Sequence, residues 1–445
     1  MLSASKLRPV PESGGSLSPW IATSSPLAVE VPSRRRGPRA ARNLRLPALF
    51  GITFALMLAT NFKSFQFLGY NFSGWAWVLI AVWSIGRIAV NQRQIAFPVW
   101  IWSPWILYVA VWTFAGYEYA LQSSSQILCP IIAGIAASTY SFSEARARVL
   151  ELWIRRSYYI CAVGIALIVI PFSLADIENS GWAGGAITLL IFQAWFLASY
   201  FLNGRKTLDL ILYFSAVAVP VIGANRGPML AGFALGVCAI IPIPLSRRLL
   251  LGGAAAAIGL AAFYTPKVQN KMFFSGQGTI QDLRASNPDL RDNGRTPLWS
   301  ALEFGMADSP LFGHGGNADR TYLLERGFSN YLPHNDWLRI RFNYGLVGVY
   351  LYAGTMLAQV LHALRKLKFA GSPPLTALTA AALTCFVPYV VVMYTDNVLI
   401  YCQYFTVPMM LLLGAAYSAK RARGIAVRHN LRPFGRPVSA FSLAK

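Results

Sequence analysis

The chain has 445 residues, of which 55% are hydrophobic and only 13% are charged, and its mean hydropathy is +0.46. Soluble domains carry roughly 25% charged residues, so this composition excludes an ordinary soluble protein. The formal net charge of +22 could indicate nucleic-acid binding, but in so hydrophobic a chain membrane topology explains the basic residues better, and we expect no nucleic-acid partner.

Residues 1–45 form the first predicted region. They are rich in Pro, Ser and Arg and contain no apolar run, which predicts a disordered basic tail and no cleavable signal peptide.

Twelve apolar runs follow, with lengths near the roughly 20 residues that cross a bilayer as a helix. They predict an all-α polytopic membrane protein with about twelve transmembrane helices and one large extracytoplasmic loop. The expected spans are 46–62, 73–90, 97–116, 119–140, 157–175, 182–202, 207–224, 228–245, 249–264, 340–362, 375–395 and 398–418.

These runs also define the regions of the chain. They are the tail 1–45, spans one to nine within 46–264, the large loop 265–335, spans ten to twelve within 336–418, and a basic tail 419–445. Most of the 39 Lys and Arg residues fall in both tails and in alternate turns, whereas the intervening loops read "GYEY", "DIENSG" and "TDN". Because basic residues mark the cytoplasmic side, both termini are expected in the cytoplasm and the large loop outside it. Anionic lipid is the expected partner of the tails.

No cofactor or metal is expected. The five cysteines all fall within predicted spans, which argues against a disulfide or a thiolate site, and no Asp/Glu cluster has metal-ligand spacing. The cysteines are Cys129, Cys161, Cys238, Cys385 and Cys402.

The large loop is the expected place of function, because about seventy residues are too many for a simple connector. Within it, "TPLWSALEFGMA" (296–307) predicts a helix, with Pro297 near its start and apolar residues at helical spacing.

Arginines on the outer side oppose the topology rule and therefore require a reason. Arg226 lies in "IGANRGPMLAG" with almost no loop to carry it into water, which costs a few kcal/mol unless it snorkels or is paired. It is either a snorkelling side chain or a two-point donor to phosphate oxygens, with Asn225 and Gly227 allowing close backbone approach.

Two further arginines open the predicted loop helix. Arg295 stands where free backbone N–H groups would suit an anion, and Arg291 is a weaker version of the same case; a solvated surface position is the alternative. Arg339 and Arg341 are two residues apart and must face different sides of a helix, so at most one is expected in a shared site.

His334 follows Pro333 and precedes Asn335 and Asp336, either of which could cap the next helix. An imidazole at the mouth of a span could take a proton from a hydroxyl, or it could be structural. His314, in "LFGHGGN", is a second candidate, although the surrounding glycines are typical of a turn and not of a nucleotide site.

Four segments together resemble the O-antigen ligase and O-antigen polymerase family. "HNDWLRIRFNYGLVG" is similar to its H-N-x-x-L signature followed by G-L-x-G, and "ANRGPMLAG" resembles its short arginine motif. "GRTPLWSALEFGMADSPLFGHGGN" resembles the element upstream of the histidine, although His314 stands where the family commonly has a small or aliphatic residue. "YTDNVLIYCQYF" resembles a turn of many exopolysaccharide polymerases. The resemblance covers residues 220–415.

The resemblance implies a metal-independent glycosyltransferase of the inner membrane with a periplasmic loop. Its donor would be a glycan on undecaprenyl pyrophosphate, and its acceptor another lipid-linked repeat or the lipid A core. Arg226 and Arg295 would hold the pyrophosphate and His334 would activate the acceptor hydroxyl, with Arg291, Asn335, Asp336, Arg339 and Arg341 as substrate-binding candidates.

Other functions remain open at this point. A polymerase and a ligase share this chemistry, and the "TDN" turn favours the polymerase. A flippase for lipid-linked glycans should show repeat symmetry and charges buried at mid-membrane, whereas these charges gather at the outer face. A non-catalytic partner of other polysaccharide assembly proteins is the last alternative.

Overall fold

The structure is a computed structural model that describes residues 45–59, 66–67, 70–164, 167, 183–204, 206–284, 287–292, 294–329, 331–367 and 371–430. The chain divides into two units, Met1–Arg42 and Asn43–Lys445, and every described element belongs to the second. The predicted tail 1–45, apart from its last residue, and the predicted "DIENSG" loop lie outside the described residues.

The described chain is almost entirely helical, which confirms the predicted class. Its only described strands are β1 (Gln66–Phe67) and β2 (Tyr70–Asn71), a short antiparallel pair. The α-helices are α2 (Ala48–Ala59), α3 (Phe72–Val90), α4 (Val99–Phe114), α5 (Ala120–Ser138), α6 (Glu144–Gly164), α8 (Ala183–Leu202), α9 (Thr207–Ile222), α10 (Arg226–Cys238), α11 (Leu245–Phe263), α12 (Pro266–Met272), α13 (Arg295–Gly305), α14 (Ala318–Glu325), α15 (Asp336–Leu367), α16 (Pro373–Thr384), α17 (Phe386–Thr395) and α18 (Thr406–Asn430). Short 3-10 turns are η1 (Gln92–Gln94), η4 (Ile280–Asp282) and η5 (Met306–Asp308).

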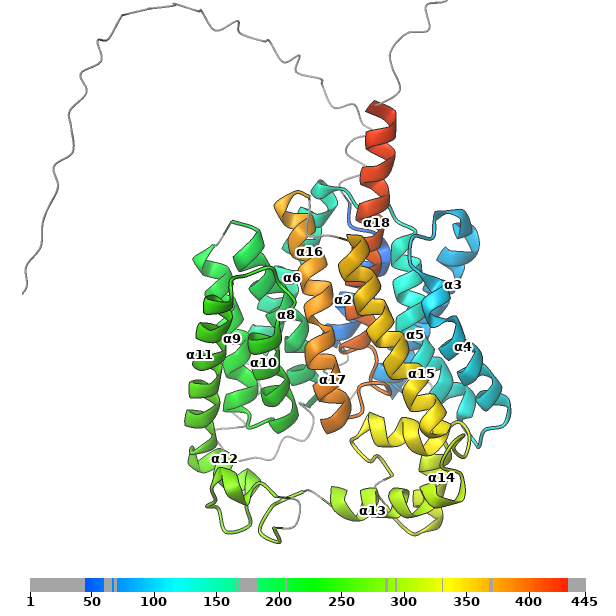
Figure 1. The fold of residues 1–445 in the computed structure, drawn as a ribbon, viewed down its shortest axis with the longest axis vertical. Coiled ribbons are helices and arrows are strands. Elements are labelled where there is room, and N and C mark those ends of the chain that lie inside the picture. The colour runs from blue at the N-terminus through cyan, green and yellow to red at the C-terminus, as the bar shows by residue number, and fades with distance from the viewer. Residues whose placement is uncertain are drawn as a thin grey trace, which may run out of the picture. The chain divides into compact units, whose positions relative to one another are not determined.

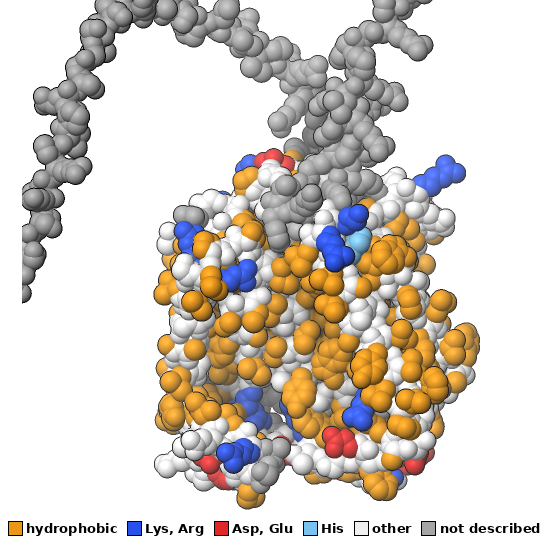
Figure 2. All heavy atoms as spheres, in the orientation of Figure 1, with side chains coloured by type: hydrophobic (Ala, Val, Ile, Leu, Met, Phe, Trp, Pro, Cys, Tyr) orange, Lys and Arg blue, Asp and Glu red, His pale blue; other side chains and the backbone are white. Residues whose placement is uncertain are grey.

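Five stretches of the described chain are long and apolar enough to cross a membrane: Ala120–Ser138, Gly185–Leu202, Leu245–Phe263, Asp336–Leu367 and Pro373–Thr395. Shorter apolar helices occupy most of the other expected spans, so the number twelve stays a prediction. Figure 2 shows apolar side chains over the middle of the visible face, with charged side chains toward its two ends. This distribution is the one that a membrane-embedded bundle requires.

One predicted boundary is wrong. The basic residues 146–156 were expected in a turn, but they lie within α6. The helix continues because its charges are paired: Arg155 bonds to Glu151 at 2.9 Å and also to Asp209 of α9, which accepts a 3.0 Å hydrogen bond from Ser199. A pattern of hydropathy cannot show that these charges neutralise one another inside the bundle.

Two later helices are also shorter at one end than the predicted spans. α10 ends at Cys238, before the end of 228–245, and α18 begins only at Thr406, within 398–418. The segment 396–405 between α17 and α18 is therefore available to form a buried turn, with Val398, Leu399 and Cys402 each at most 1% exposed.

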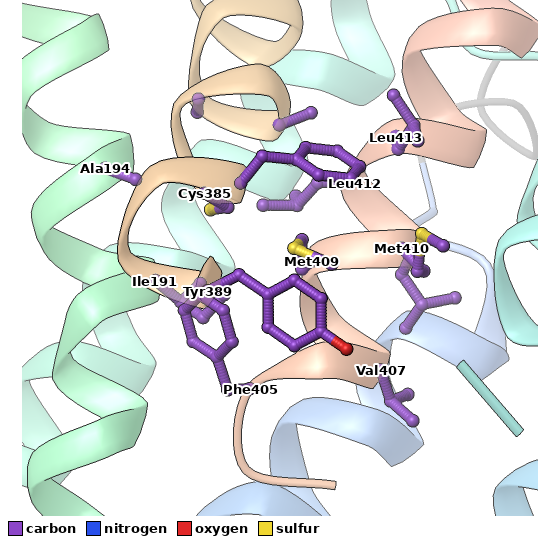
Figure 3. Close-up of a cluster of buried hydrophobic side chains, with 14 of the residues drawn as sticks. Ile191, Ala194, Cys385, Tyr389, Phe405, Val407, Met409, Met410, Leu412 and Leu413 are labelled. Atoms are coloured by element: carbon purple, nitrogen blue, oxygen red, sulfur yellow. The ribbon is translucent and has the colours of Figure 1, made fainter. Parts of the chain in front are cut away.

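The main core lies where α8, α16, α17 and α18 meet (Figure 3). Ile191 of α8 lies beside Tyr389 of α17, whose ring stacks on Phe405 at 6.1 Å, and Ala194 of α8 lies level with Cys385. Met409 and its neighbours on α18 lie on the opposite side of α17 from α8. This packing holds α17 and the following turn in fixed positions.

The loop elements lie together at one end of the helices. Figure 1 shows α12, α13 and α14 running across the lower end, next to the N-terminal end of α15 and the C-terminal end of α17. The helix predicted over 296–307 is α13, which confirms it to within two residues at each end. Leu298 and Leu302 of α13 pack with Phe342 of α15 in a second small core.

Candidate functional site

Asn335 and Asp336 fix the N-terminal end of α15. Asn335 is the N-cap residue, because its Oδ1 accepts the Leu338 N–H at 3.0 Å. Asp336 is 0% exposed, and its Oδ2 accepts the Leu399 N–H at 2.8 Å. These contacts tie the start of α15 to the turn after α17, which favours a positioning role for both side chains over direct contact with a substrate.

A break within α15 binds the helix to the loop. Gly345 has φ of 65°, and the backbone N–H groups of Leu346 and Val347 donate to Pro310 and Leu311 at 3.0 Å instead of continuing the helix. A Cβ at Gly345 would lie 2.2 Å from the Leu311 carbonyl oxygen. Only glycine fits there, so the "PLFG" and "GLVG" segments of the sequence are two halves of one junction.

His334 lies one residue before the cap and faces Asp396. Its Nδ1 is 3.2 Å from Asp396 Oδ1, and Asn397 Nδ2 is also 3.2 Å from this nitrogen. We assign the proton to Nδ1 because the charged carboxylate of Asp396 only accepts and is the stronger partner, although the Asn397 amide nitrogen, a donor, favours the other tautomer. Within the described chain, Nε2 has no hydrogen-bond partner. The ring, about 30% exposed, therefore presents a basic nitrogen to its surroundings.

Arg295, the first residue of α13, reaches the same turn. Its Nη1 donates to the Thr395 carbonyl at 3.0 Å. Burial lowers the pKa of its guanidinium overall, although the negative charges of Asp396 and Asp292 act in the opposite direction. Asp396 is therefore the neighbour that Arg295 and His334 share.

Arg226, the first residue of α10, precedes Gly227, which lies against Thr395. Its Nη1 donates to the Arg291 carbonyl at 2.6 Å, and its charge and that of Arg295 repel each other. Gly227 permits this approach, because a Cβ there would lie 2.6 Å from Thr395 Oγ1. The close backbone approach expected at Gly227 is thus to α17.

The N-terminus of α13 is less open to an anion than the sequence predicted. Asp292 Oδ1 accepts the Gly294 N–H at 2.9 Å, and its Oδ2 accepts the Thr296 N–H at 2.8 Å. Burial raises the pKa of Asp292, but these hydrogen bonds outweigh it and lower the pKa overall. The prediction of free N–H groups at this end is wrong for Thr296, so any anion must be held mainly by side chains.

Arg291 completes the arginine cluster, which we define as Arg226, Arg291 and Arg295. Its guanidinium lies 5.0 Å from the Phe274 ring centroid, and its buried Nε has no partner in the described chain. Figure 2 shows a hollow between the lower helices and the loop elements, with Lys or Arg side chains in its wall. The guanidinium groups of Arg226 and Arg295 lie near the carboxylates of Asp292 and Asp396, whereas Arg291 contributes its backbone carbonyl to Arg226.

The remaining pair of arginines divides as the sequence predicted. Arg339 is 5% exposed and bonds through Nε to Asp319 at 3.0 Å and through Nη2 to Ser123 at 2.9 Å. Arg341, two residues on, is exposed. Arg339 is thus neutralised by Asp319, and neither arginine joins the arginine cluster.

His314 has a structural environment. Its ring Nε2 is 2.8 Å from the Gly305 carbonyl oxygen, and the ring stacks on that of Phe342 with 4.6 Å between centroids. Its backbone N–H donates to the Phe342 carbonyl at 3.0 Å. These contacts hold the glycine-rich turn between α13 and α15, so His314 serves packing here.

The sequence reasoning missed Asp396 as a member of the site. The acidic "TDN" turn was noted only for topology and family resemblance, whereas its carboxylate contacts a histidine 62 positions earlier. Asp319, the partner of Arg339, was missed because the two residues lie 20 positions apart on different helices. Outer-side acidic residues in short turns are the pattern that could have identified Asp396.

Comparisons with known proteins agree with the geometry. Within the described residues, no three His, Cys, Asp or Glu side chains are grouped so that they could hold a metal ion. No curated protein matches the chain. A family model described as O-antigen ligase matches residues 210–353, which include Arg226, the loop and His334. This match, over about a third of the chain, supports the resemblance to the O-antigen ligase and polymerase family.

Proposed function

We propose that the protein is a membrane glycosyltransferase that moves a glycan from undecaprenyl pyrophosphate to a saccharide hydroxyl, and that it polymerises lipid-linked repeats. One observation carries the proposal: Arg226, Arg295 and the His334–Asp396 pair, far apart in sequence, come together at the end of α17. An anion site beside an oriented base is what glycosyl transfer from a pyrophosphate needs.

The arginine cluster suits the pyrophosphate of the donor. Arg226 and Arg295 repel each other, and an anion between them would relieve that repulsion. A guanidinium can bind phosphate oxygens at two points, which Arg226 and Arg295 would do, whereas the Arg291 guanidinium lies at the Phe274 ring with its Nε buried. The lipid tail would remain in the bilayer next to α10 and α17, with the phosphates at the membrane surface.

His334 would act as the general base. The acceptor hydroxyl gives its proton to Nε2 while its oxygen attacks the anomeric carbon, and the bond from that carbon to the pyrophosphate oxygen breaks. The electron pair leaves on the pyrophosphate, where the arginine cluster stabilises the new charge. Asp396 stabilises the imidazolium that forms. A single displacement of this kind inverts the anomeric centre and requires no metal ion.

The topology rule gives the cellular setting of the proposal. With both termini in the cytoplasm, the site lies on the periplasmic side of the inner membrane, where the donor glycan is displayed. The acceptor is another lipid-linked repeat; the resemblance of the "YTDNVLIYCQYF" turn to exopolysaccharide polymerases supports this choice over lipid A core.

The test is transfer by the purified protein in lipid nanodiscs. Lipid-linked repeats alone should give a ladder of longer lipid-linked chains, with inverted linkage by NMR. A product that forms only when lipid A core is added would make the protein a ligase. No transfer in either mixture, with donor instead moved between leaflets in vesicles, would make it a flippase and overturn the proposal.

A further inference from the structure

A cavity of about 290 Å³ is lined in part by Tyr331 and Leu332, which precede His334, and by none of the residues of the arginine cluster. Its wall is built by α3, α5, α14, the segment 331–332 before His334, and the segment 400–403 after Asp396. The volume is near the lower end of the roughly 300–1,000 Å³ typical of small-molecule sites. None of the catalytic residues assigned above lines it.

Aromatic rings form much of the wall. Trp77, Tyr119, Tyr331 and Tyr401 all line the cavity. Arg320 fixes two of them, because its guanidinium lies 4.8 Å from the Tyr119 ring centroid and 4.5 Å from that of Tyr331. Rings with an apolar body and a polar tip are suited to a ligand that has both apolar faces and hydroxyl groups.

Amide side chains supply the polar contacts. Gln122, Gln126 and Gln403 line the cavity, and each offers both a donor and an acceptor. Gln403 is 1% exposed, yet its Oε1 has no partner within the described chain, and the same holds for Trp77 Nε1. Both atoms are closed to solvent in the structure, so we expect exposed Gln122 to supply the polar contact with a ligand.

The charge of the cavity differs from that of the arginine cluster. Arg339 lines the cavity, but Asp319 neutralises it in a buried pair with 3.0 Å between Nε and Oδ2. Arg320 is engaged with two rings. The lining therefore favours an uncharged polar ligand over a phosphate, which would need open guanidinium groups.

Two short segments connect the cavity to the residues around His334 and Asp396. Leu332 lines the cavity two residues before His334, and Tyr401 lines it while its N–H donates to the Asn397 carbonyl at 3.2 Å. Resting on the proposed function, we infer that this cavity binds the terminal sugar of the acceptor and directs one of its hydroxyl groups toward His334. The arginine cluster then holds the donor from the opposite side.

The inference is tested by binding to the full chain in nanodiscs. The probes are the free oligosaccharide released by mild acid from the cells' own lipid-linked glycan, and undecaprenyl pyrophosphate without sugar. The cavity variant is Gln122→Ala with Tyr331→Ala, and the control is Gln94→Ala with Tyr264→Ala, which changes the same residue types outside the cavity. Calorimetry gives Kd for each probe.

We expect the cavity variant to raise the Kd of the oligosaccharide at least tenfold while leaving that of undecaprenyl pyrophosphate unchanged, with both constants unchanged in the control. Saturation with undecaprenyl pyrophosphate that carries only the first donor sugar should not displace the oligosaccharide. Displacement would place the donor's sugar in the cavity and overturn the inference. The inference would also be overturned if the wild type bound no oligosaccharide, or if the cavity variant bound it with an unchanged Kd.

These outcomes are separable from those of the proposed function. Oligosaccharide binding is measured without turnover, so it can depend on the cavity even if no transfer occurs. Conversely, His334→Ala should reduce transfer to a small residual rate while keeping the Kd of the oligosaccharide within about twofold of wild type. Loss of transfer without loss of binding in this variant supports the division between base and sugar site.

Discussion

Asp396→Ala should slow transfer by removing the carboxylate that stabilises protonated His334. The charges would lie 3.2 Å apart in the transition state. Their attraction is about 5 kcal/mol at an effective dielectric constant of about 20, and about 1 kcal/mol in bulk water. The two side chains are 30% and 14% exposed, which places the site between these limits. We therefore expect a loss of roughly 2–3 kcal/mol in transition-state stabilisation, or a roughly 30- to 200-fold lower rate.

The assay is the single-turnover rate of transfer in nanodiscs at saturating donor, for wild type, Asp396→Ala, His334→Ala and the double variant. Asp308→Ala, at an exposed loop carboxylate, is the matched control and should keep the wild-type rate. Because Asp396 is expected to act through His334, its removal should cost almost nothing further in the His334→Ala background. An equal loss of rate in both backgrounds would refute this reasoning and indicate that Asp396 acts through Arg295 instead of His334.

Other changes have separate expected outcomes. Arg339→Ala leaves the buried Asp319 carboxylate without its ion-pair partner and should lower the free energy of unfolding by about 3–5 kcal/mol. The measurement is thermal melting in detergent. Arg341→Ala, at an exposed side chain, is the control and should leave the melting temperature unchanged. His314→Ala removes a 2.8 Å hydrogen bond and should cost about 1–3 kcal/mol of stability with transfer retained in the folded fraction. Gly345→Ala would place a Cβ 2.2 Å from a backbone oxygen, and should expose the junction of loop and α15 to limited proteolysis.

Local patterns predicted the parts of the fold that depend on local causes. Pro297 and the apolar spacing after it indicated α13, and the residues around His334 indicated the start of α15 with its cap. The position of Arg226 at a tight turn was evident because a charge near the hydrocarbon boundary has few alternatives. The sequence left Asn335 and Asp336 as alternative caps, and the structure shows that it is Asn335.

Long-range partners could not be predicted in the same way. Arg339 was considered for substrate binding, but its role depends on Asp319 and on Ser123, 216 positions earlier. α6 extends through residues that hydropathy excludes, because Asp209 of another helix neutralises Arg155. Asp396 likewise contacts His334 only because the fold brings the end of α17 next to that histidine. In each case the deciding charge comes from another element, which spacing within one segment does not reveal.

The central claim is that His334 and the arginine cluster perform glycan transfer. It is tested most directly by the chain length of surface and secreted polysaccharide in cells that carry His334→Ala, Arg226→Ala or His314→Ala at equal membrane abundance. We expect only single repeats with the first two variants and normal chains with His314→Ala. Wild-type chain lengths in all three would contradict the account, because the residues around Thr395 would then have no part in polymerisation.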